Sequence, residues 1–223
     1  IDKKYFEKLS DEYHAELDIL TKKIYKMADM EFNINSPKQL GEVIFGKMGI
    51  QSPGKSKAKK NASGGFSTKV SILEELEEDN PIIKEILFYR ELQKLLSTYI
   101  DVIPKMAGDD GRLHAKFLQN GTTTGRFSSQ DPNLQNLPIK TELGRRIRGG
   151  FIAQKDHKLA AFDYSQIELR VAAMLSGDEK MTQVFCVRKD IHTGVASFVF
   201  NVPIGSVDNE MRRKAKIINF GII

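Results

Sequence analysis

The sequence contains few features that crosslink a protein chain or anchor it in a membrane. Its single cysteine, Cys186, excludes a disulfide framework and a thiolate zinc site, and it suits a reducing compartment. No run of about 18 apolar residues occurs, and the charged N-terminus lacks the apolar centre of a signal peptide. The sequence therefore predicts no transmembrane helix and no secretory leader.

Several familiar catalytic motifs are also absent. The segment GTTTGR lacks the Lys-Ser/Thr ending of a phosphate-binding P-loop, and neither Gly-x-Gly-x-x-Gly nor a nucleophile elbow occurs. The histidines show no spacing typical of metal ligands, and such isolated histidines are more often structural than functional. They are His14, His114, His157 and His192.

Length and composition fit one compact globular domain with an appendage, because 223 residues that are 40% hydrophobic and 28% charged allow a sizeable core. The formal net charge is only +5, but the charge is unevenly spread: residues 51–69 contain five lysines and no acid. Such a patch favours a polyanionic partner, for example nucleic acid or nucleotide phosphates. A solvated basic surface explains the charge pattern equally well.

The first hundred residues are predicted to be mostly helical. Apolar residues over 6–27 recur at steps of three and four, which is typical of an amphipathic helix. Ser-Pro and Asn-Pro pairs open two further helices, over 36–49 and 80–104. Between them, the Gly-, Ser- and Lys-rich segment 51–65 predicts a mobile basic loop.

The pattern changes near residue 110. Apolar and polar residues alternate in RLHAKFLQ (112–119), as in a half-buried strand, whereas HKLAAFDY (157–164) predicts a strand buried on both faces. A helix is expected from Ser165, with Gly177 as its C-cap. The sequence thus predicts an α+β fold with Asp163 at the carboxyl end of a buried strand, a common position for chemistry.

Two acids near this strand end each allow a functional and a structural interpretation. Asp163 is a candidate ligand for a divalent metal, because a carboxylate at the mouth of a buried strand needs a cationic partner. The alternative is that Asp163 caps the following helix. Glu168 has the spacing of a capping box with Ser165, three residues apart at a helix start.

The last segment predicts a helix with a cationic face. Arg212, Lys216 and Phe220 lie four residues apart and so share one face of a helix that opens near Asp208. Two fixed cations and a flat ring suit a nucleoside triphosphate. A basic solvated face with an incidental phenylalanine is the alternative. The apolar stripe expected to be buried consists of Met211, Ala215, Ile218 and Ile222.

Four segments together identify a family. TGRFSSQDPNLQNLP, DYSQIELRVAAMLSGD, DIHTGVASFVF and RRKAKIINFG occur in the order and spacing found in family A DNA polymerases, the bacterial DNA polymerase I type. The sequence resembles that family over nearly its whole length. The resemblance implies a right-hand architecture, with a helical thumb over 1–100, a mixed α/β first part of the palm over 101–177, and the start of the helical fingers over 178–223.

The resemblance also implies roles for individual residues at a nucleotide site. Asp163 and the carbonyl of Tyr164 match the ligands of catalytic magnesium, of which a complete active site holds two ions. Glu168 matches the steric gate that excludes a ribose 2′-hydroxyl. The groups matching catalytic contacts to the triphosphate are His192, Arg212 and Lys216, and the remaining nucleotide-binding candidates are Ser165, Gln166 and Phe220.

A second set of residues is expected to contact DNA. Arg126, Asn133 and Gln135 match residues that contact the minor groove of a primer-template duplex. This agrees with the need of a template-directed enzyme to accept every base pair, because the minor groove carries a degenerate pattern of acceptors. Phosphate contacts are expected from the lysines of the basic segment, Lys55, Lys57, Lys59 and Lys60.

The sequence departs from the family at Ile223. Family members continue with a Tyr-Gly pair and later supply a second catalytic aspartate in a His-Asp-Glu motif. The expectation is therefore a truncated product or one half of a split polymerase, partnered by its C-terminal half. Its location would be cytoplasmic, associated with the nucleoid if bacterial. A non-catalytic duplex-binding module and a nucleotide-binding regulatory protein are the alternative functions.

Overall fold

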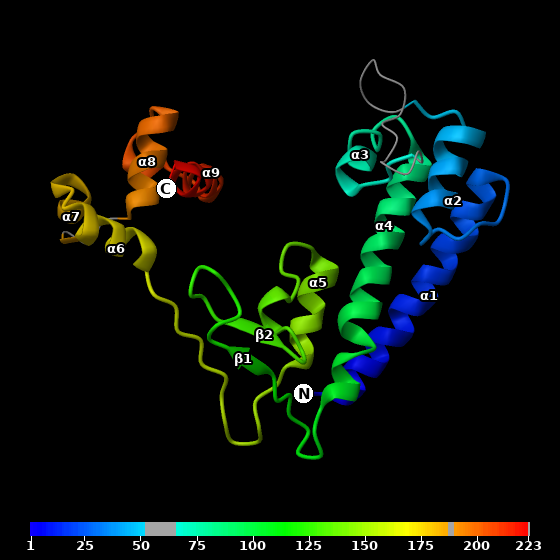
Figure 1. Ribbon diagram of the computed structural model, residues 1–223, viewed down its shortest axis with the longest axis horizontal. Helices are drawn as coiled ribbons and strands as arrows, with labels where there is room; N and C mark the ends of the chain where they lie inside the picture. Colours follow the sequence, from blue (N-terminus) through cyan, green and yellow to red (C-terminus); the bar gives the residue numbers. More distant parts are fainter. Residues whose placement is uncertain (52–65, 187–189, 223) are drawn as a thin grey trace. The chain divides into compact units, whose positions relative to one another are not determined.

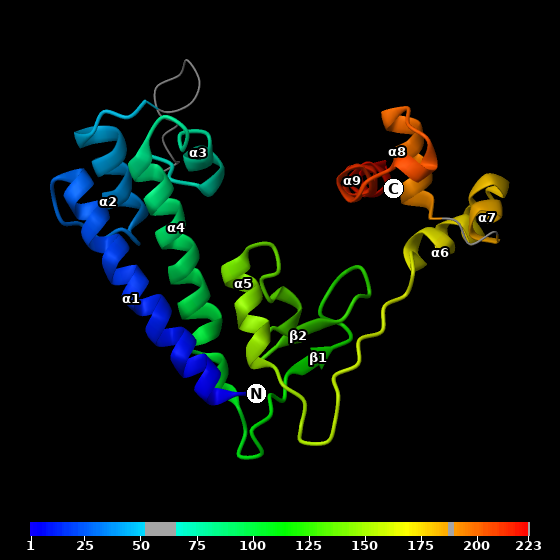
Figure 2. The same cartoon turned by 180° about the vertical axis from the view of Figure 1, so that it is seen from behind.

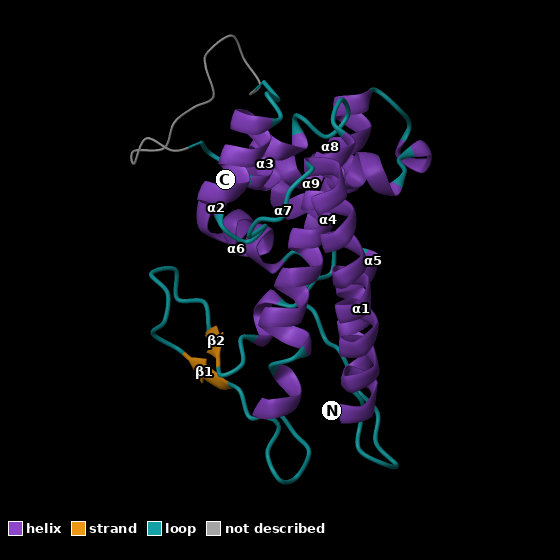
Figure 3. Cartoon of the chain, turned by 90° about the vertical axis from the view of Figure 1, so that its right-hand side faces the viewer, coloured by secondary structure: helices purple, strands orange, loops and turns teal. Residues whose placement is uncertain are grey.

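The computed structural model describes residues 1–51, 66–186 and 190–222, except the side chains at positions 180, 220 and 222. The described chain is mostly helical, and its only strands form one small antiparallel pair (Figure 3). It divides into two units, Ile1–Leu159 and Ala160–Ile223. No helix in the described ranges is long and apolar enough to cross a membrane.

The elements of the two units are as follows. The first unit contains α1 (Lys3–Ala28), α2 (Pro37–Gly41), α3 (Val70–Glu74), α4 (Pro81–Leu95), β1 (Lys116–Leu118), β2 (Ser128–Gln130) and α5 (Glu142–Ile147). The second contains α6 (Ile167–Ser176), α7 (Glu179–Cys186), α8 (Ile191–Phe200) and α9 (Asn209–Ile222). Short π-helical turns at Glu42–Lys47 and Leu96–Ile100 extend α2 and α4. Single 3-10 turns occupy Ile103–Met106, Leu134–Asn136, Arg148–Gly150 and Ile204–Ser206.

Two long helices, α1 and α4, pack side by side and form the core of the first unit (Figure 1). The side chain of Asp2 caps α1 by accepting a hydrogen bond from the Tyr5 amide at 3.0 Å. The helices of the structure confirm those expected over 6–27, 36–49 and 80–104. Fully buried side chains on these two helices include Phe6, Ile24, Ile83, Ile86 and Leu92.

Helix α5 docks against α1 through aromatic residues. The Tyr13 hydroxyl donates to the carbonyl of Leu143 at 3.0 Å, and the Asp2 amide donates to the carbonyl of Gly150 at 2.9 Å. A Cβ atom at Gly150 would lie 2.3 Å from the Phe6 ring, so only glycine allows this close approach. These contacts fix the chain that follows the β1–β2 pair onto the helical core.

The first expected strand is shorter and more exposed than predicted. Only Lys116–Leu118 forms β1, which pairs antiparallel with β2 and places Phe117 opposite Ser129. Phe117 is 56% exposed, so the alternation over 112–119 does not mark a half-buried strand. No further strand of the described chain pairs with β1 or β2.

The second expected strand, over 157–164, is wrong for this chain. The segment is a loop that leads into α6, visible in yellow in Figure 2, and Phe162 is 96% exposed. A strand requires hydrogen-bonded neighbours, and among the described residues only β1 and β2 pair with each other. The α+β expectation is thus confirmed only as a mostly helical chain with one small sheet.

The second unit has a small core. Helix α6 packs on α7 around Leu169, Ala173 and Phe185, and α8 packs on α9. Of the apolar stripe expected on α9, Ala215 is fully buried, but Ile218 is 38% exposed. The stripe therefore packs at its middle and is open to solvent one turn later.

Burial in the α1–α4 core predicts a large difference between two matched substitutions. Ile83→Ala, at a fully buried position of α4, should lower the free energy of unfolding by about 2–5 kcal/mol. Ile19→Ala, at a 67% exposed position of α1, should change it by less than about 0.5 kcal/mol. Urea denaturation followed by circular dichroism measures both, and equal effects would contradict the assigned core.

Candidate active site

The second unit contains a polar pocket of about 680 Å³. Its lining comes from three chain segments, which lie over 163–170 before and within α6, at the start of α8, and on α9. Several acids and cations predicted from separate motifs therefore meet in one cavity. The polar residues that line it are Asp163, Tyr164, Ser165, Gln166, Glu168, Arg170, Asp190, His192, Arg212 and Lys216.

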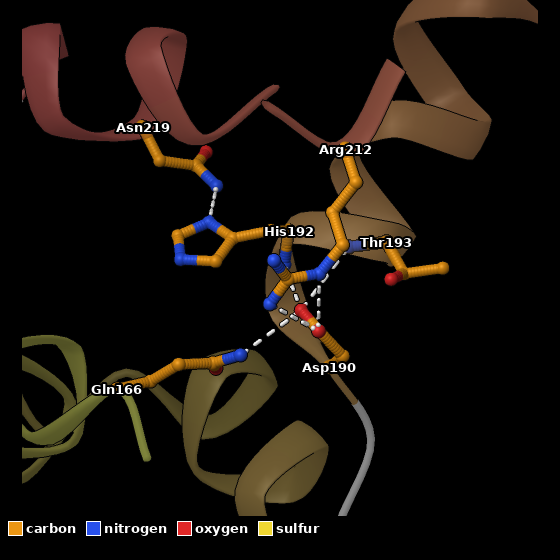
Figure 4. Close-up of polar contacts among 6 residues, drawn as sticks. All are labelled: Gln166, Asp190, His192, Thr193, Arg212 and Asn219. Atoms are coloured by element: carbon orange, nitrogen blue, oxygen red, sulfur yellow. Dashed lines mark hydrogen bonds and ion pairs between the residues drawn. The ribbon is translucent and has the colours of Figure 1, made fainter. Parts of the chain in front are cut away.

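Asp190 is the centre of the polar contacts in this pocket (Figure 4). Its side chain caps α8, because Oδ1 accepts hydrogen bonds from the amides of His192 at 2.8 Å and Thr193 at 3.2 Å. The same oxygen accepts from Gln166 Nε2 at 2.9 Å. The other oxygen, Oδ2, lies 2.7 Å from both Nε and Nη2 of Arg212.

These contacts keep the Asp190 carboxylate charged. Burial raises its pKa, but the hydrogen bond from Arg212 and those from the Thr193 and His192 amides outweigh burial. The pKa of Asp190 consequently lies below its ordinary value. The carboxylate therefore acts as a fixed anion at the N-terminus of α8, where the helix dipole also favours negative charge.

His192 is buried at 2% exposure and is oriented by Asn219 of α9 (Figure 4). The Asn219 amide nitrogen lies 2.8 Å from Nδ1 of the ring, and an amide NH₂ group only donates hydrogen bonds. Nδ1 is therefore the acceptor, and the neutral ring carries its proton on Nε2. In this tautomer Nε2–H of His192 is a hydrogen-bond donor.

The start of α6 does not form the expected capping box. The helix begins at Ile167, and Gln166 precedes it in the left-handed conformation with φ 54° and without a side-chain cap. Ser165 and Glu168 are therefore not capping partners, which corrects the structural interpretation of Glu168. Gly177, by contrast, is confirmed as the C-cap, with φ 67°.

Gln166 and Arg170 hold this turn from the pocket side. Gln166 bonds Asp190 through Nε2, while its Oε1 is buried and has no hydrogen-bond partner among the described residues. Arg170 donates from Nε to the Ser165 carbonyl at 2.8 Å and lies over the Phe185 ring at 4.7 Å. A donor from a bound ligand or water would satisfy the open acceptor of Gln166.

The oxygen donors near the pocket suit magnesium but do not complete a site for it. Asp163 is exposed, lies beside Tyr164 and is a pocket-lining carboxylate, as is Glu168. In the described part of the chain no three His, Cys, Asp or Glu side chains cluster as metal ligands would. Mg²⁺ is often held by one or two carboxylates with waters and substrate phosphates, so the donor type fits.

The candidate DNA contacts lie in the first unit, around β2. Arg126 is exposed just before this strand, and Asn133 caps the turn after it by accepting from the Gln135 amide at 3.1 Å. Gln135 donates from Nε2 to the carbonyl of Phe127 at 2.9 Å. The structure thus groups these three residues at the two ends of one short strand.

Some predicted residues cannot be placed, and some pocket residues were not predicted. Lys55, Lys57, Lys59 and Lys60 lie outside the described residues, as does the side chain of Phe220 in α9. Sequence reasoning missed Asp190, Asn219 and Arg170. Asp190 alone carried a signal, because it stands directly before a helical segment like other N-capping aspartates.

The environment of His192 predicts a measurable pKa. Burial is the largest cause that lowers the pKa of His192 below about 6.5; the Asp190 carboxylate opposes it, and the Arg212 and Lys216 charges lower it further. Arg212→Gln should therefore raise this pKa, observed by NMR titration of the ring. Lys214→Gln, which removes a cation paired with Glu210 on the same helix, should leave it unchanged.

The sign of the associated stability change follows from the same pKa. Below about pH 6.5 the unfolded chain takes up a proton that the folded ring resists, so stability should decrease as pH falls through this range. A titration of His192 at or above its ordinary pKa would contradict the buried, neutral ring.

Comparison with known proteins agrees with the sequence motifs. A model of DNA polymerase family A matches residues 3–223. The chain is 49% identical to the thermostable DNA polymerase I of Thermus aquaticus and 45% identical to DNA polymerase I of Chloroflexus aurantiacus. Each alignment includes the whole chain but only 26% and 24% of the relative, so the chain spans about a quarter of their length.

A solved structure matches the fold. The polymerase domain of Pol1 from M. smegmatis, in complex with DNA primer-template and dNTP, is 36% identical, with a TM-score of 0.84. The match covers the whole chain and 38% of that protein chain. Because the family model and these relatives account for essentially every residue, the chain belongs to DNA polymerase family A and is part of a polymerase domain homologous to DNA polymerase I.

Proposed function

We propose that this chain contributes the nucleotide-binding part of a DNA-directed DNA polymerase, which transfers a nucleotide from a dNTP to a primer 3′-hydroxyl. The observation that supports this most directly is the pocket of the second unit. It gathers Asp163, Glu168, His192, Arg212 and Lys216 from three separate segments. A site with acids along one segment and cations on a facing helix suits a triphosphate and its metal ions.

In this proposal the cations and His192 bind the triphosphate. Arg212 and Lys216 lie one turn apart on α9 and neutralise phosphate charge, while the Nε2–H of neutral His192 donates a further hydrogen bond. Phe220 would stack beside the incoming sugar one turn later on the same helix. Ser165 and Gln166 complete the nucleotide contacts from the turn before α6.

Asp163 and the carbonyl of Tyr164 would hold magnesium at the edge of this pocket. When bound, magnesium supplies charge neutralisation at the phosphates and activation of the attacking hydroxyl. Because the described residues offer only part of a two-ion site, the remaining carboxylate would come from the rest of the polymerase domain. We therefore propose that the C-terminal half of the domain is a required partner.

Glu168 is proposed as the steric gate for the sugar. The left-handed conformation of Gln166 at the start of α6 prevents a capping box between Ser165 and Glu168. Glu168 instead lines the pocket from the first turn of α6. A side chain in that place would fill the space of a 2′-hydroxyl and so favour deoxyribonucleotides.

The first unit is proposed to hold the primer-template. Arg126, Asn133 and Gln135 would contact the minor groove, and the lysines of 51–69 would contact phosphates. The similar M. smegmatis polymerase domain was solved with primer-template DNA and dNTP, which supports both ligands for this chain. We further propose a thumb over 1–100, the first part of the palm over 101–177 and the start of the fingers over 178–223.

Removal of the proposed metal ligand tests the reaction. In the chain combined with the rest of a family A polymerase domain, Asp163→Asn should reduce primer extension by more than about a hundredfold, because a metal ligand is lost. Asp178→Asn, an isosteric change at an acid outside the pocket, is the matched control. Duplex binding without extension by the intact assembly would instead favour the non-catalytic duplex-binding module.

The sugar gate has its own test. Glu168→Ala should raise incorporation of ribonucleotides relative to deoxyribonucleotides by at least about tenfold, because the space for the 2′-hydroxyl opens. Competing incorporation of rNTP and dNTP on one primer-template measures the ratio. Glu179→Ala serves as a control in α7, and an unaltered ratio in Glu168→Ala would remove Glu168 from sugar selection.

A further inference from the structure

The Asp190 carboxylate accepts hydrogen bonds from three separate parts of the second unit. Oδ1 accepts from two amides at the start of α8 and from Gln166, whereas Oδ2 accepts from Arg212 of α9. Because the α8 amides fix Oδ1, the carboxylate cannot turn without uncapping the helix. The start of α8 therefore sets the position of Oδ2, and Oδ2 in turn sets the position of the Arg212 guanidinium.

The guanidinium is held by one edge. Nε and Nη2 face Oδ2 of Asp190 at 2.7 Å, and within the described residues Nη1 makes no hydrogen bond. A guanidinium is planar and carries five N–H donors, so fixing the Nε edge also fixes the direction of the Nη1 edge. Arg212 can therefore keep its bond to Asp190 and still offer donors to a ligand in the pocket that it lines.

The same carboxylate sets the spacing between Arg212 and His192. His192 is the second residue of α8, and its own amide donates to Asp190. The Asp190 carboxylate thus holds the backbone of His192 and the side chain of Arg212, which are both proposed to contact the triphosphate. The Asp190 carboxylate is also held in its ionised form by these donors, so the anchor persists at neutral pH.

We propose that Asp190 is a positioning residue that presets Arg212 for the terminal phosphates of the incoming nucleotide and remains bonded to Arg212 when the triphosphate is bound. The proposal rests on the proposed function of the pocket. Its physical basis is preorganisation: an arginine ordered before binding loses less side-chain entropy when it contacts phosphate. A carboxylate that merely capped α8 would have no effect on triphosphate binding beyond helix stability.

The first experiment measures steady-state primer extension in the chain combined with the rest of the polymerase domain. Asp190→Asn keeps an oxygen for the α8 amides but removes the charge that orients Arg212. We expect KM for dNTP to rise about tenfold with a smaller change in kcat, because Arg212 binds phosphate in the ground and transition states alike. Duplex affinity should be unchanged.

Two controls separate positioning from a general structural effect. Asp178→Asn makes the same chemical change at the acid whose Oδ1 accepts the Met181 amide of α7 at 2.7 Å, and it should leave KM unchanged. In an Arg212→Lys background, Asp190→Asn should add less than about a twofold change in KM. An unchanged KM in Asp190→Asn, or full additivity with Arg212→Lys, would overturn the proposal.

The second experiment needs neither activity nor the rest of the polymerase. The ¹H–¹⁵N NMR signal of Arg212 Nε is expected to show a strongly hydrogen-bonded, slowly exchanging proton, and inorganic triphosphate should shift the Nη signals while the Nε signal stays bonded. Release of Nε on titration would show that phosphate displaces Asp190 and would contradict its positioning role.

The two experiments also distinguish this proposal from the proposed function. If the wild-type assembly never extends a primer, the proposed function fails, while the Nε signal still decides whether Asp190 holds Arg212 during triphosphate binding. If Asp190→Asn disturbs folding, the KM measurement is made on Asp190→Ser, which retains a capping oxygen without charge.

Discussion

The hydrogen bonds to one carboxylate, that of Asp190, organise the second unit of this chain. The pocket residues come from three parts of the sequence, and the buried cluster between α6 and α7 is small. Asp190 compensates by joining the turn before α6, the start of α8 and the α9 side chain Arg212 through charge-assisted hydrogen bonds. The placement of the pocket cations therefore depends on this anion as well as on the packing of α8 against α9.

The first unit is built on a different principle. Its core is an extended hydrophobic contact between α1 and α4, and α5 is added through tyrosine hydroxyls and a glycine that lets backbone meet the Phe6 ring. Hydrophobic burial of this kind is strongly stabilising and needs few polar contacts. The β1–β2 pair, with Arg126, Asn133 and Gln135 around it, is held on this helical base and presents exposed side chains.

Prediction from sequence succeeded where the information was local. The helix of 6–27 follows from its apolar spacing, and the C-cap at Gly177 follows from a residue that tolerates positive φ. Prediction from sequence failed where the structure of a segment depended on residues distant in the sequence. HKLAAFDY has the composition of a buried strand, but a strand needs neighbours to pair with, and this segment finds none in the described chain. The Ser165–Glu168 spacing likewise suggested a cap that the left-handed Gln166 prevents.

The sequence by itself determined the helices, the family and the candidate residues at the nucleotide site, because helix periodicity, caps and motif spacing are properties of neighbouring residues. It could not show that Asp190 would meet Arg212 and Gln166, or that Asn219 would fix the tautomer of His192. Only the tertiary structure decided those pairings. A hydrogen bond between residues more than 20 positions apart depends on how separate helices pack, and no local pattern contains that distance.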